Sequence, residues 1–266
     1  MCGRYALSTD RDALALEFEV DAVTDVQLPP RWNIAPTSDI YIVRERTEGE
    51  DVVRELVVAR WGLVPSWAKD DSIGSKLANA RCETASSKPS FRSAFRDRRC
   101  LVLADGWYEW QPVAVAGSSR PRKQPYLMTI GGRPHAAFAG LYEWWRNPAL
   151  PADSPLLMTA TLLTTDAVGP AATVHDRMPV VLDPVDFADW LNPAGGELAS
   201  QVLTTALAKL AQTPIGVRPV SPDVNAVRND GPGLWDVFTP EPAGSVAGSK
   251  SAAPAGAGRE EQPGLF

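Results

Sequence analysis

The sequence contains few residues that bind metals or form disulfides. Its 266 residues include three cysteines, Cys2, Cys82 and Cys100, and two histidines, His135 and His175, with no C-x-x-C pair. An odd number of cysteines does not build a disulfide framework. The set also supplies too few soft ligands for a convincing zinc site. We therefore expect a protein that works without a metal or another cofactor.

Long apolar runs are absent as well. No stretch of the sequence approaches the roughly 20 apolar residues of a membrane helix. The first residues also lack the basic region and apolar segment of a signal peptide, because charged residues begin at Arg4. The sequence predicts a cytoplasmic protein that does not contact membranes.

An excess of positive charge is missing too, since the net charge is −6. This argues weakly against a nucleic-acid partner, but the charges are unevenly distributed. The segment 76–99 has two acidic residues, Glu83 and Asp97, against seven basic ones. The basic residues are Lys76, Arg81, Lys88, Arg92, Arg96, Arg98 and Arg99. Composition slightly favours a solvated basic face over a phosphate-binding surface.

Runs of β-branched and aromatic residues, separated by Pro, Gly and Asp, predict many strands. They occupy residues 39–46, 51–62, 100–110, 125–130, 135–145 and 156–165. Apolar spacing predicts three helices, at 8–20 with Ser8 or Thr9 as cap, at 183–191 with Asp183 as cap, and at 196–210. The helix at 196–210 places Leu198, Val202, Ala206 and Leu210 on one stripe. The pattern predicts an α+β domain, mostly of β structure, without alternating βα units.

The end of the sequence differs in composition from the rest. Residues 239–266 are rich in Pro, Gly, Ala and Ser, which predicts a disordered tail after a folded domain at 1–238. The tail ends in "EEQPGLF", where Gln262, Leu265 and Phe266 resemble the short peptide that docks bacterial proteins on the replication sliding clamp. Such short patterns arise often by chance, so clamp docking is a hypothesis.

Cys2 would become the N-terminus after removal of Met1, which gives an amine and a thiol on adjacent carbons. Both groups ionise near neutral pH in ordinary peptides. The amine could act as base for a thiol that attacks an acyl carbon, as in N-terminal-nucleophile hydrolases. Alternatively, the amine could condense with an aldehyde, and the thiol could close a thiazolidine ring. A small buried residue in a first strand is the third interpretation.

Other local clusters contain residues suited to stacking or to proton transfer. Trp61 and Trp67 lie in a polar, proline-containing segment, where they could stack on bases or pack between sheets. Glu109 lies between two aromatic residues, a setting that raises a carboxyl pKa toward that of a proton shuttle. His175 precedes Asp176, which could orient its imidazole for proton transfer.

Taken together, several motifs resemble one known family. In chain order they are "MCGRY", "RWNIAPT", "WGLVPSWAKD", "NARCETASSKPSFRSAF", "RRCLVLADGWYEW", "FAGLYEWW" and "TTDAVGPAATVHDRMPVVL". The sequence from Met1 to about Phe238 thereby resembles the SOS-response-associated peptidase (SRAP) family. The resemblance implies mostly antiparallel, curved sheets that form a barrel-like core flanked by short helices. It also implies a monomer, located at the nucleoid, that recognises abasic sites in single-stranded DNA during the DNA damage response.

The resemblance implies a role for each matching residue. Cys2 would form a covalent thiazolidine crosslink with the ring-opened sugar, and Asn79 would hold Cys2 and the sugar in place. Glu109 would be the acid and base for amine and imine proton transfers. His175 would protonate the sugar oxygen during ring opening. The peptidase name refers to autocatalytic exposure of Cys2, although an aminopeptidase could also remove Met1, and a lyase activity stays open.

The resemblance further assigns four DNA-binding residues. Arg4 and Arg81 would grip phosphates beside the lesion, while Trp67 and Pro36 would hold the flanking strand bent open. Two other functions stay open from the residues alone. The first is a cysteine peptidase or N-terminal-nucleophile hydrolase acting on peptides, and the second is a noncovalent single-strand-binding module in which Cys2 is incidental.

Overall fold

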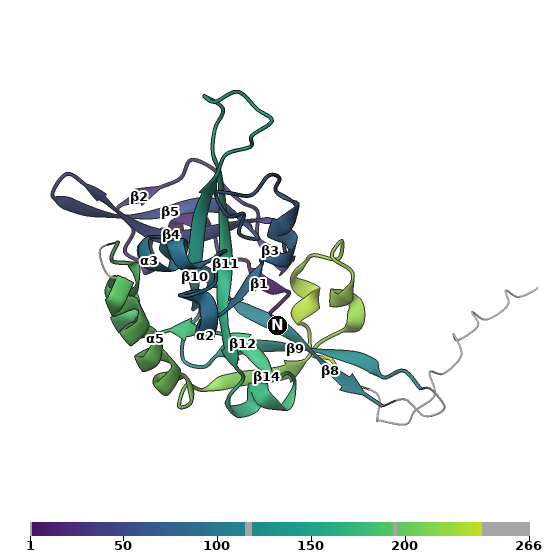
Figure 1. The fold of residues 1–266 in the computed structure, drawn as a ribbon. Helices are drawn as coiled ribbons and strands as arrows, with labels where there is room; N and C mark the ends of the chain where they lie inside the picture. The colour runs from purple at the N-terminus through teal and green to yellow at the C-terminus, as the bar shows by residue number, and fades with distance from the viewer. Residues whose placement is uncertain (1, 115–118, 194–195, 241–266) are drawn as a thin grey trace, which may run out of the picture.

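The computed structural model describes residues 2–114, 119–193 and 196–240 (Figure 1). Five strands of the larger sheet close into a ring, because each pairs with the next and the last pairs with the first. In order around the ring they are β11 (Leu157–Asp166), β10 (Ala136–Trp145), β7 (Arg99–Ala104), β4 (Asp39–Glu48) and β5 (Asp51–Trp61). All neighbours are antiparallel except β5 and β11, which run parallel.

Four short strands attach to this ring. β6 (Asn79–Arg81) runs parallel to β11, and β2 (Ala22–Val23) runs parallel to β5. β12 (Arg177–Pro179) and β13 (Val181–Leu182) add antiparallel pairs to β11 and β10. The parallel pairing of β6 matters for the site, because it fixes Asn79 opposite Leu162 of β11.

A second, antiparallel sheet lies against the ring and carries the N-terminus (Figure 1). Its strands, in spatial order, are β14 (Ile215–Pro219), β9 (Arg122–Ile130), β8 (Gly106–Val113), β1 (Tyr5–Leu7) and β3 (Arg31–Ile34). β8 and β9 form a long hairpin that projects from the body of the molecule (Figure 1).

The predicted mostly antiparallel α+β fold is confirmed, and the closed ring fits the barrel-like core that the family resemblance implied. One predicted strand is divided in two. Residues 100–110 contribute to both sheets, since β7 ends at Ala104 and β8 begins at Gly106. At the division, the Asp105 N–H donates to the Ala6 carbonyl at 2.7 Å, which directs the chain from the ring to β1.

The three predicted helices are present, with changes at two helix starts. α1 (Arg11–Glu17) is capped by Asp10, because Ser8 is bound instead to the Asp105 carboxylate. A 3-10 turn, η3 (Pro184–Asp186), follows the predicted cap Asp183 and leads into α4 (Phe187–Leu191). α5 (Gly196–Leu210) packs the predicted stripe into the main hydrophobic core, beside α4 and β13.

The remaining helices are short. α2 (Cys82–Ala85) and α3 (Arg92–Asp97) follow β6 in the chain. Single 3-10 turns form η1 (Ser72–Lys76), η2 (Gly169–Thr173), η4 (Pro222–Asn225) and η5 (Pro232–Trp235). Within the described residues, every helix is too short or too polar to cross a membrane.

An aromatic cluster joins the ring to the second sheet. The ring of Tyr5 meets Trp61 edge-on at 5.2 Å between centroids, and Phe138 lies edge-on to Trp107 at 5.8 Å. All four side chains are fully buried. Trp61 is therefore a core residue, and only Trp67 of the two tryptophans considered for stacking on bases remains exposed.

Candidate active site

Cys2 lies just before β1 and is held from the opposite sheet. The Asn79 Nδ2 donates to the Cys2 carbonyl at 2.7 Å, across 77 residues of sequence. The Cys2 thiol is fully buried and donates weakly to the Arg4 carbonyl at 3.8 Å. Because β6 is fixed by its pairing with β11, Asn79 anchors the N-terminal segment to the ring.

Glu109 lies next to this segment on β8. Tyr5 of β1 is paired with Trp107 of β8, and the Tyr108 N–H donates to the Arg4 carbonyl at 2.9 Å. The backbone contact between the two segments therefore extends beyond β1 toward Cys2 on one side and Glu109 on the other. Burial, with a contribution from the charge of Asp176, raises the Glu109 pKa to about 7. Glu109 can therefore both give and accept a proton near neutral pH.

The Cys2 thiol is kept protonated by the same surroundings. Burial and then the negative charge of Glu109 raise its pKa well above the ordinary value. A thiol with a raised pKa is a poor nucleophile until a nearby base takes its proton. The protonation state of Glu109 therefore affects how readily the Cys2 thiol loses its proton.

His175 faces Glu109 from the segment after η2. Its Nε2 lies 3.9 Å from the Glu109 Oε2. Its Nδ1 accepts the Arg177 N–H at 2.9 Å and lies 2.8 Å from an Asp176 carboxylate oxygen. The first contact requires a bare Nδ1 and the second a protonated one. Since burial lowers the His175 pKa, we assign the neutral ring with its proton on Nε2, directed toward Glu109.

These groups border an open cleft of about 700 Å³. Its lining residues are Arg4, Glu109, Trp110, Pro112, Lys123, Val174, His175, Asp176 and Asn225. Cys2 does not line the cleft, since it is fully buried. The structure therefore brings together the four predicted catalytic residues: the buried Glu109 and the partly exposed His175 border the cleft, and Cys2 and Asn79 are joined to each other.

Arg4 is engaged within the protein. Its Nη1 donates to the Asn33 Oδ1 at 2.7 Å and to the Val224 carbonyl at 2.9 Å, and its guanidinium lies 5.8 Å from the centre of the Trp110 ring. The Arg4 Nη1 thus holds η4 against the site. Phosphate binding by Arg4 stays a prediction.

Asn33 is a site residue that the sequence did not single out. It is fully buried, and its Nδ2 faces three backbone carbonyls of the segment 224–229, at 2.7 to 3.2 Å. Together with Arg4 it fixes the segment that carries Asn225 into the cleft. The motif "RWNIAPT" contains Asn33, but nothing local in the sequence distinguishes it from a surface asparagine.

Pro36 and Trp67 lie in two turns that meet at Trp61. Residues 35–38 form a type II turn with Pro36 at its second position and Thr37, at φ 75°, at its third. The Thr37 N–H donates to the Trp61 carbonyl at 2.7 Å, directly before the loop that carries Trp67. Trp67 is 61% exposed, which is unusual for so large an apolar side chain.

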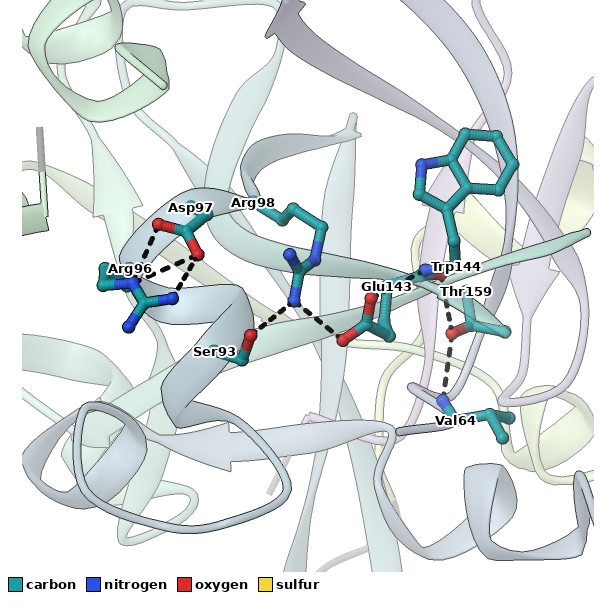
Figure 2. Close-up of polar contacts among 8 residues, drawn as sticks. All are labelled: Val64, Ser93, Arg96, Asp97, Arg98, Glu143, Trp144 and Thr159. Atoms are coloured by element: carbon teal, nitrogen blue, oxygen red, sulfur yellow. Dashed lines mark hydrogen bonds and ion pairs between the residues drawn. The ribbon is translucent and has the colours of Figure 1, made fainter. Parts of the chain in front are cut away.

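The loop of Trp67 is firmly attached. The Val64 N–H donates to Thr159 at 2.9 Å (Figure 2), and the Trp145 indole donates to the Ala68 carbonyl at 2.9 Å. Gly62, at φ 127°, approaches Gly74 so closely that a Cβ would lie 2.5 Å from the Gly74 carbonyl oxygen. An exposed indole on a rigid loop is suited to stacking on a base.

The basic segment 76–99 divides into two groups. Arg98 binds the buried Glu143 at 2.9 Å and Ser93 at 2.8 Å, and Arg96 pairs with Asp97 (Figure 2). Arg99 is buried and donates to backbone carbonyls, including that of Trp190 at 2.8 Å. The four others are exposed and form no ion pair with any described residue. These are Lys76, Arg81, Lys88 and Arg92.

Comparison with known proteins agrees with this arrangement. The family model described as SOS response associated peptidase (SRAP) matches residues 1–227. The chain belongs to this family. This finding confirms the family resemblance, whereas the roles of the individual SRAP site residues stay predictions.

Individual relatives align over most of their length. Abasic site processing protein YoqW of Bacillus subtilis is 34% identical over 235 residues, which cover 88% of this chain and 98% of YoqW. Abasic site processing protein HMCES of Gallus gallus is 31% identical over 271 residues, covering 87% of this chain and 76% of HMCES. A crystal structure of a Bacteroides thetaiotaomicron protein matches with a TM-score of 0.70 at 22% identity, covering 90% and 100% of the two chains, and supports the fold.

Proposed function

We propose that this SRAP protein processes abasic sites in single-stranded DNA by forming a covalent thiazolidine crosslink through Cys2. The observation that carries the proposal is the joining of Cys2 to Asn79, beside Glu109, whose pKa is raised to about 7, and His175, whose Nε2 lies 3.9 Å from the Glu109 Oε2. The names of the relatives YoqW and HMCES, both abasic site processing proteins, support the same substrate.

The chemistry starts when removal of Met1 frees the amine of Cys2. The protonated form of His175 donates its Nε2 proton to the ring oxygen of the abasic sugar as the bond from that oxygen to C1′ breaks, which leaves the neutral imidazole. The ionised Glu109 takes the proton of the C1′ hydroxyl, which becomes the aldehyde. The amine adds to the aldehyde carbon, and loss of one water gives an imine. The thiol sulfur then bonds to the imine carbon while the nitrogen gains a proton, which closes the thiazolidine.

Glu109 carries the proton transfers of these steps. A carboxyl group with a pKa near 7 can take a proton from the attacking amine and return it to the departing water. The raised pKa of the thiol favours amine attack first, because the sulfur becomes reactive only after losing its proton. Once the amine is consumed as the imine, the adjacent thiol is tethered to its target carbon.

DNA binding is proposed to use the exposed groups around the site. Arg81, Lys88 and Arg92 would contact phosphates, while Trp67 and the Pro36 turn would hold a flanking base. These contacts carry little sequence information, which suits a lesion that has no base to read. The noncovalent step should therefore weaken as salt concentration rises.

The decisive experiment is to incubate purified protein, with Met1 removal verified, with single-stranded DNA that contains one abasic site. We expect a heat-stable adduct on the N-terminal peptide, absent with intact DNA and detected by denaturing gel and mass spectrometry. Cys2→Ser should keep DNA affinity and lose the adduct, because it keeps the amine and lacks the sulfur. A heat-stable adduct with Cys2→Ser would contradict the thiazolidine, and peptide turnover without any adduct would favour the hydrolase alternative.

We also propose that the C-terminal peptide docks on the replication sliding clamp. Gln262, Leu265 and Phe266 lie outside the described residues, so the proposal rests on the sequence alone. The composition of residues 239–261 predicts a tether before two apolar anchors, an arrangement suited to such docking. Deleting residues 262–266 should abolish clamp binding in a pull-down, and equal binding by the shortened chain would contradict the proposal.

A further inference from the structure

The cleft contains a cation to which neither the sequence nor the family resemblance assigned a role. Lys123 lines the cleft from β9, where it is paired with Pro112 of β8. Its side chain is exposed and forms no ion pair with any described residue. Arg4, the other cation of the lining, is bound to Asn33 and Val224. Lys123 is therefore a lining cation that no described carboxylate neutralises, and its ammonium is available to an incoming anion.

The hairpin that carries Lys123 is fixed beside the cleft. The Trp110 indole donates to Asn225 at 2.6 Å, and the Gln111 amide donates to the Thr173 carbonyl at 2.7 Å. The Tyr126 hydroxyl in turn donates to the Gln111 amide oxygen at 3.2 Å. These contacts join β8 and β9 to the segments that carry Asn225 and His175, so the backbone of Lys123 keeps its place relative to the reacting groups.

The order of the strands places Cys2 between two cationic positions. Asn79 of β6 binds the Cys2 carbonyl, and Arg81 lies two residues further along β6, on the same face as Asn79. On the other side, Cys2 precedes β1, which is followed in the sheet by β8 and then by β9 with Lys123. Arg81 and Lys123 therefore lie on elements on opposite sides of Cys2.

We propose that Lys123 binds a backbone phosphate of single-stranded DNA on the β9 side of the abasic sugar, opposite Arg81. The inference rests on the proposed function and names a further substrate-binding residue for it. A lysine ammonium is a compact point charge on a flexible stem, so it can follow a phosphate without demanding one geometry. This property suits a site that must accept any flanking sequence.

Lys123 also influences His175. The groups that face the imidazole are Glu109 on β8, Asp176 beside it and Lys123 on β9. Burial is the main cause of the lowered His175 pKa, the positive charge of the N-terminal amine is the next, and the positive charge of Lys123 makes a smaller contribution in the same direction. A phosphate bound to Lys123 would offset that charge and raise the His175 pKa, so DNA binding would favour the protonated ring that assists sugar opening.

The test uses the full chain and a single strand that contains a tetrahydrofuran abasic analogue, which has no aldehyde and reports binding alone. Lys123→Met should weaken binding about 3- to 10-fold at low salt and reduce the slope of log K against log salt by about 0.7, the value for one phosphate contact. Lys123→Arg should retain most of the slope. Arg146→Met, which removes a charge from the separate β10–β11 hairpin, should change neither quantity (Figure 1).

A second measurement separates charge from structure. NMR titration of His175 should give a higher pKa in Lys123→Met than in the native protein, with Lys123→Arg close to native. Unchanged salt slope and unchanged His175 pKa in Lys123→Met would overturn the proposal. Failure of the proposed function would look different, since the native protein would then form no adduct with aldehyde-bearing abasic DNA, whatever the result for Lys123.

Discussion

The five-stranded ring and the N-terminal edge of the second sheet are both well buried, yet they bury different kinds of group. Most buried residues of the ring strands, such as Ile42, Leu101 and Phe138, are apolar, and the buried Glu143 is ion-paired with Arg98. The edge around Cys2 instead buries a thiol, the carboxyl of Glu109 and the amide of Asn33. Burial of apolar groups stabilises a fold, whereas burial of an ionisable carboxyl costs stability and is typical of catalytic sites.

This contrast predicts that a substitution in the core of the ring can lower stability without lowering the rate of adduct formation. Phe138→Ala removes a fully buried ring that contacts both Tyr5 and Trp107, and it should lower the free energy of unfolding by about 3–5 kcal/mol. At temperatures where the variant is folded, the adduct should form at nearly the native rate. Urea unfolding measures the first quantity and adduct gels the second. A destabilisation below about 1 kcal/mol would show that the cluster does not join the two sheets as described.

The reverse is expected for Glu109→Gln. Adduct formation should slow at least 100-fold, in line with loss of a general acid and base. The free energy of unfolding at pH 8 should nevertheless rise, by up to about 3 kcal/mol, because a pKa raised from 4.5 to about 7 is a cost to the folded state once the group is ionised.

The pH dependence gives the sign of this effect. Between pH 4.5 and about 7 the folded protein holds the Glu109 proton more tightly than the unfolded chain does. The free energy of unfolding of the native protein should therefore fall as pH rises through that window. The Glu109→Gln variant should not show this fall, because it has no carboxyl group to ionise. Equal pH profiles of stability for the two proteins would contradict the buried, shifted carboxyl.

A smaller effect is expected at the turn that carries Pro36. Thr37 has φ 75°, a conformation that costs a residue with a side chain about 1 kcal/mol or more. Thr37→Gly should relieve this strain and raise the free energy of unfolding by about 1 kcal/mol or less, since the added freedom of the unfolded chain offsets part of the gain. Loss of stability in thermal unfolding would instead show that the Thr37 side chain contributes contacts worth more than the strain.

Composition could not predict which basic residues of the segment 76–99 are exposed and which are ion-paired within the protein. Arg81 and Arg98 look alike in the sequence, but Arg81 faces solvent from β6 while Arg98 neutralises the buried Glu143 of β10. The partner of Arg98 lies 45 residues away. Only the packing of α3 against β10 brings the two together, so no local pattern separates a structural arginine from one available to DNA.

The sequence by itself determined the strands of the ring, the three main helices and the family, because alternation of apolar residues and short motifs are local properties of the chain. It also singled out Cys2, Asn79, Glu109 and His175. Tertiary structure alone decided that Asn79 holds the Cys2 carbonyl, that Arg4 is bound to Asn33, and that Trp61 is buried while Trp67 is exposed. The physical reason is that a hydrogen bond or a buried charge depends on strand register and sheet closure, which bring together residues far apart in the chain.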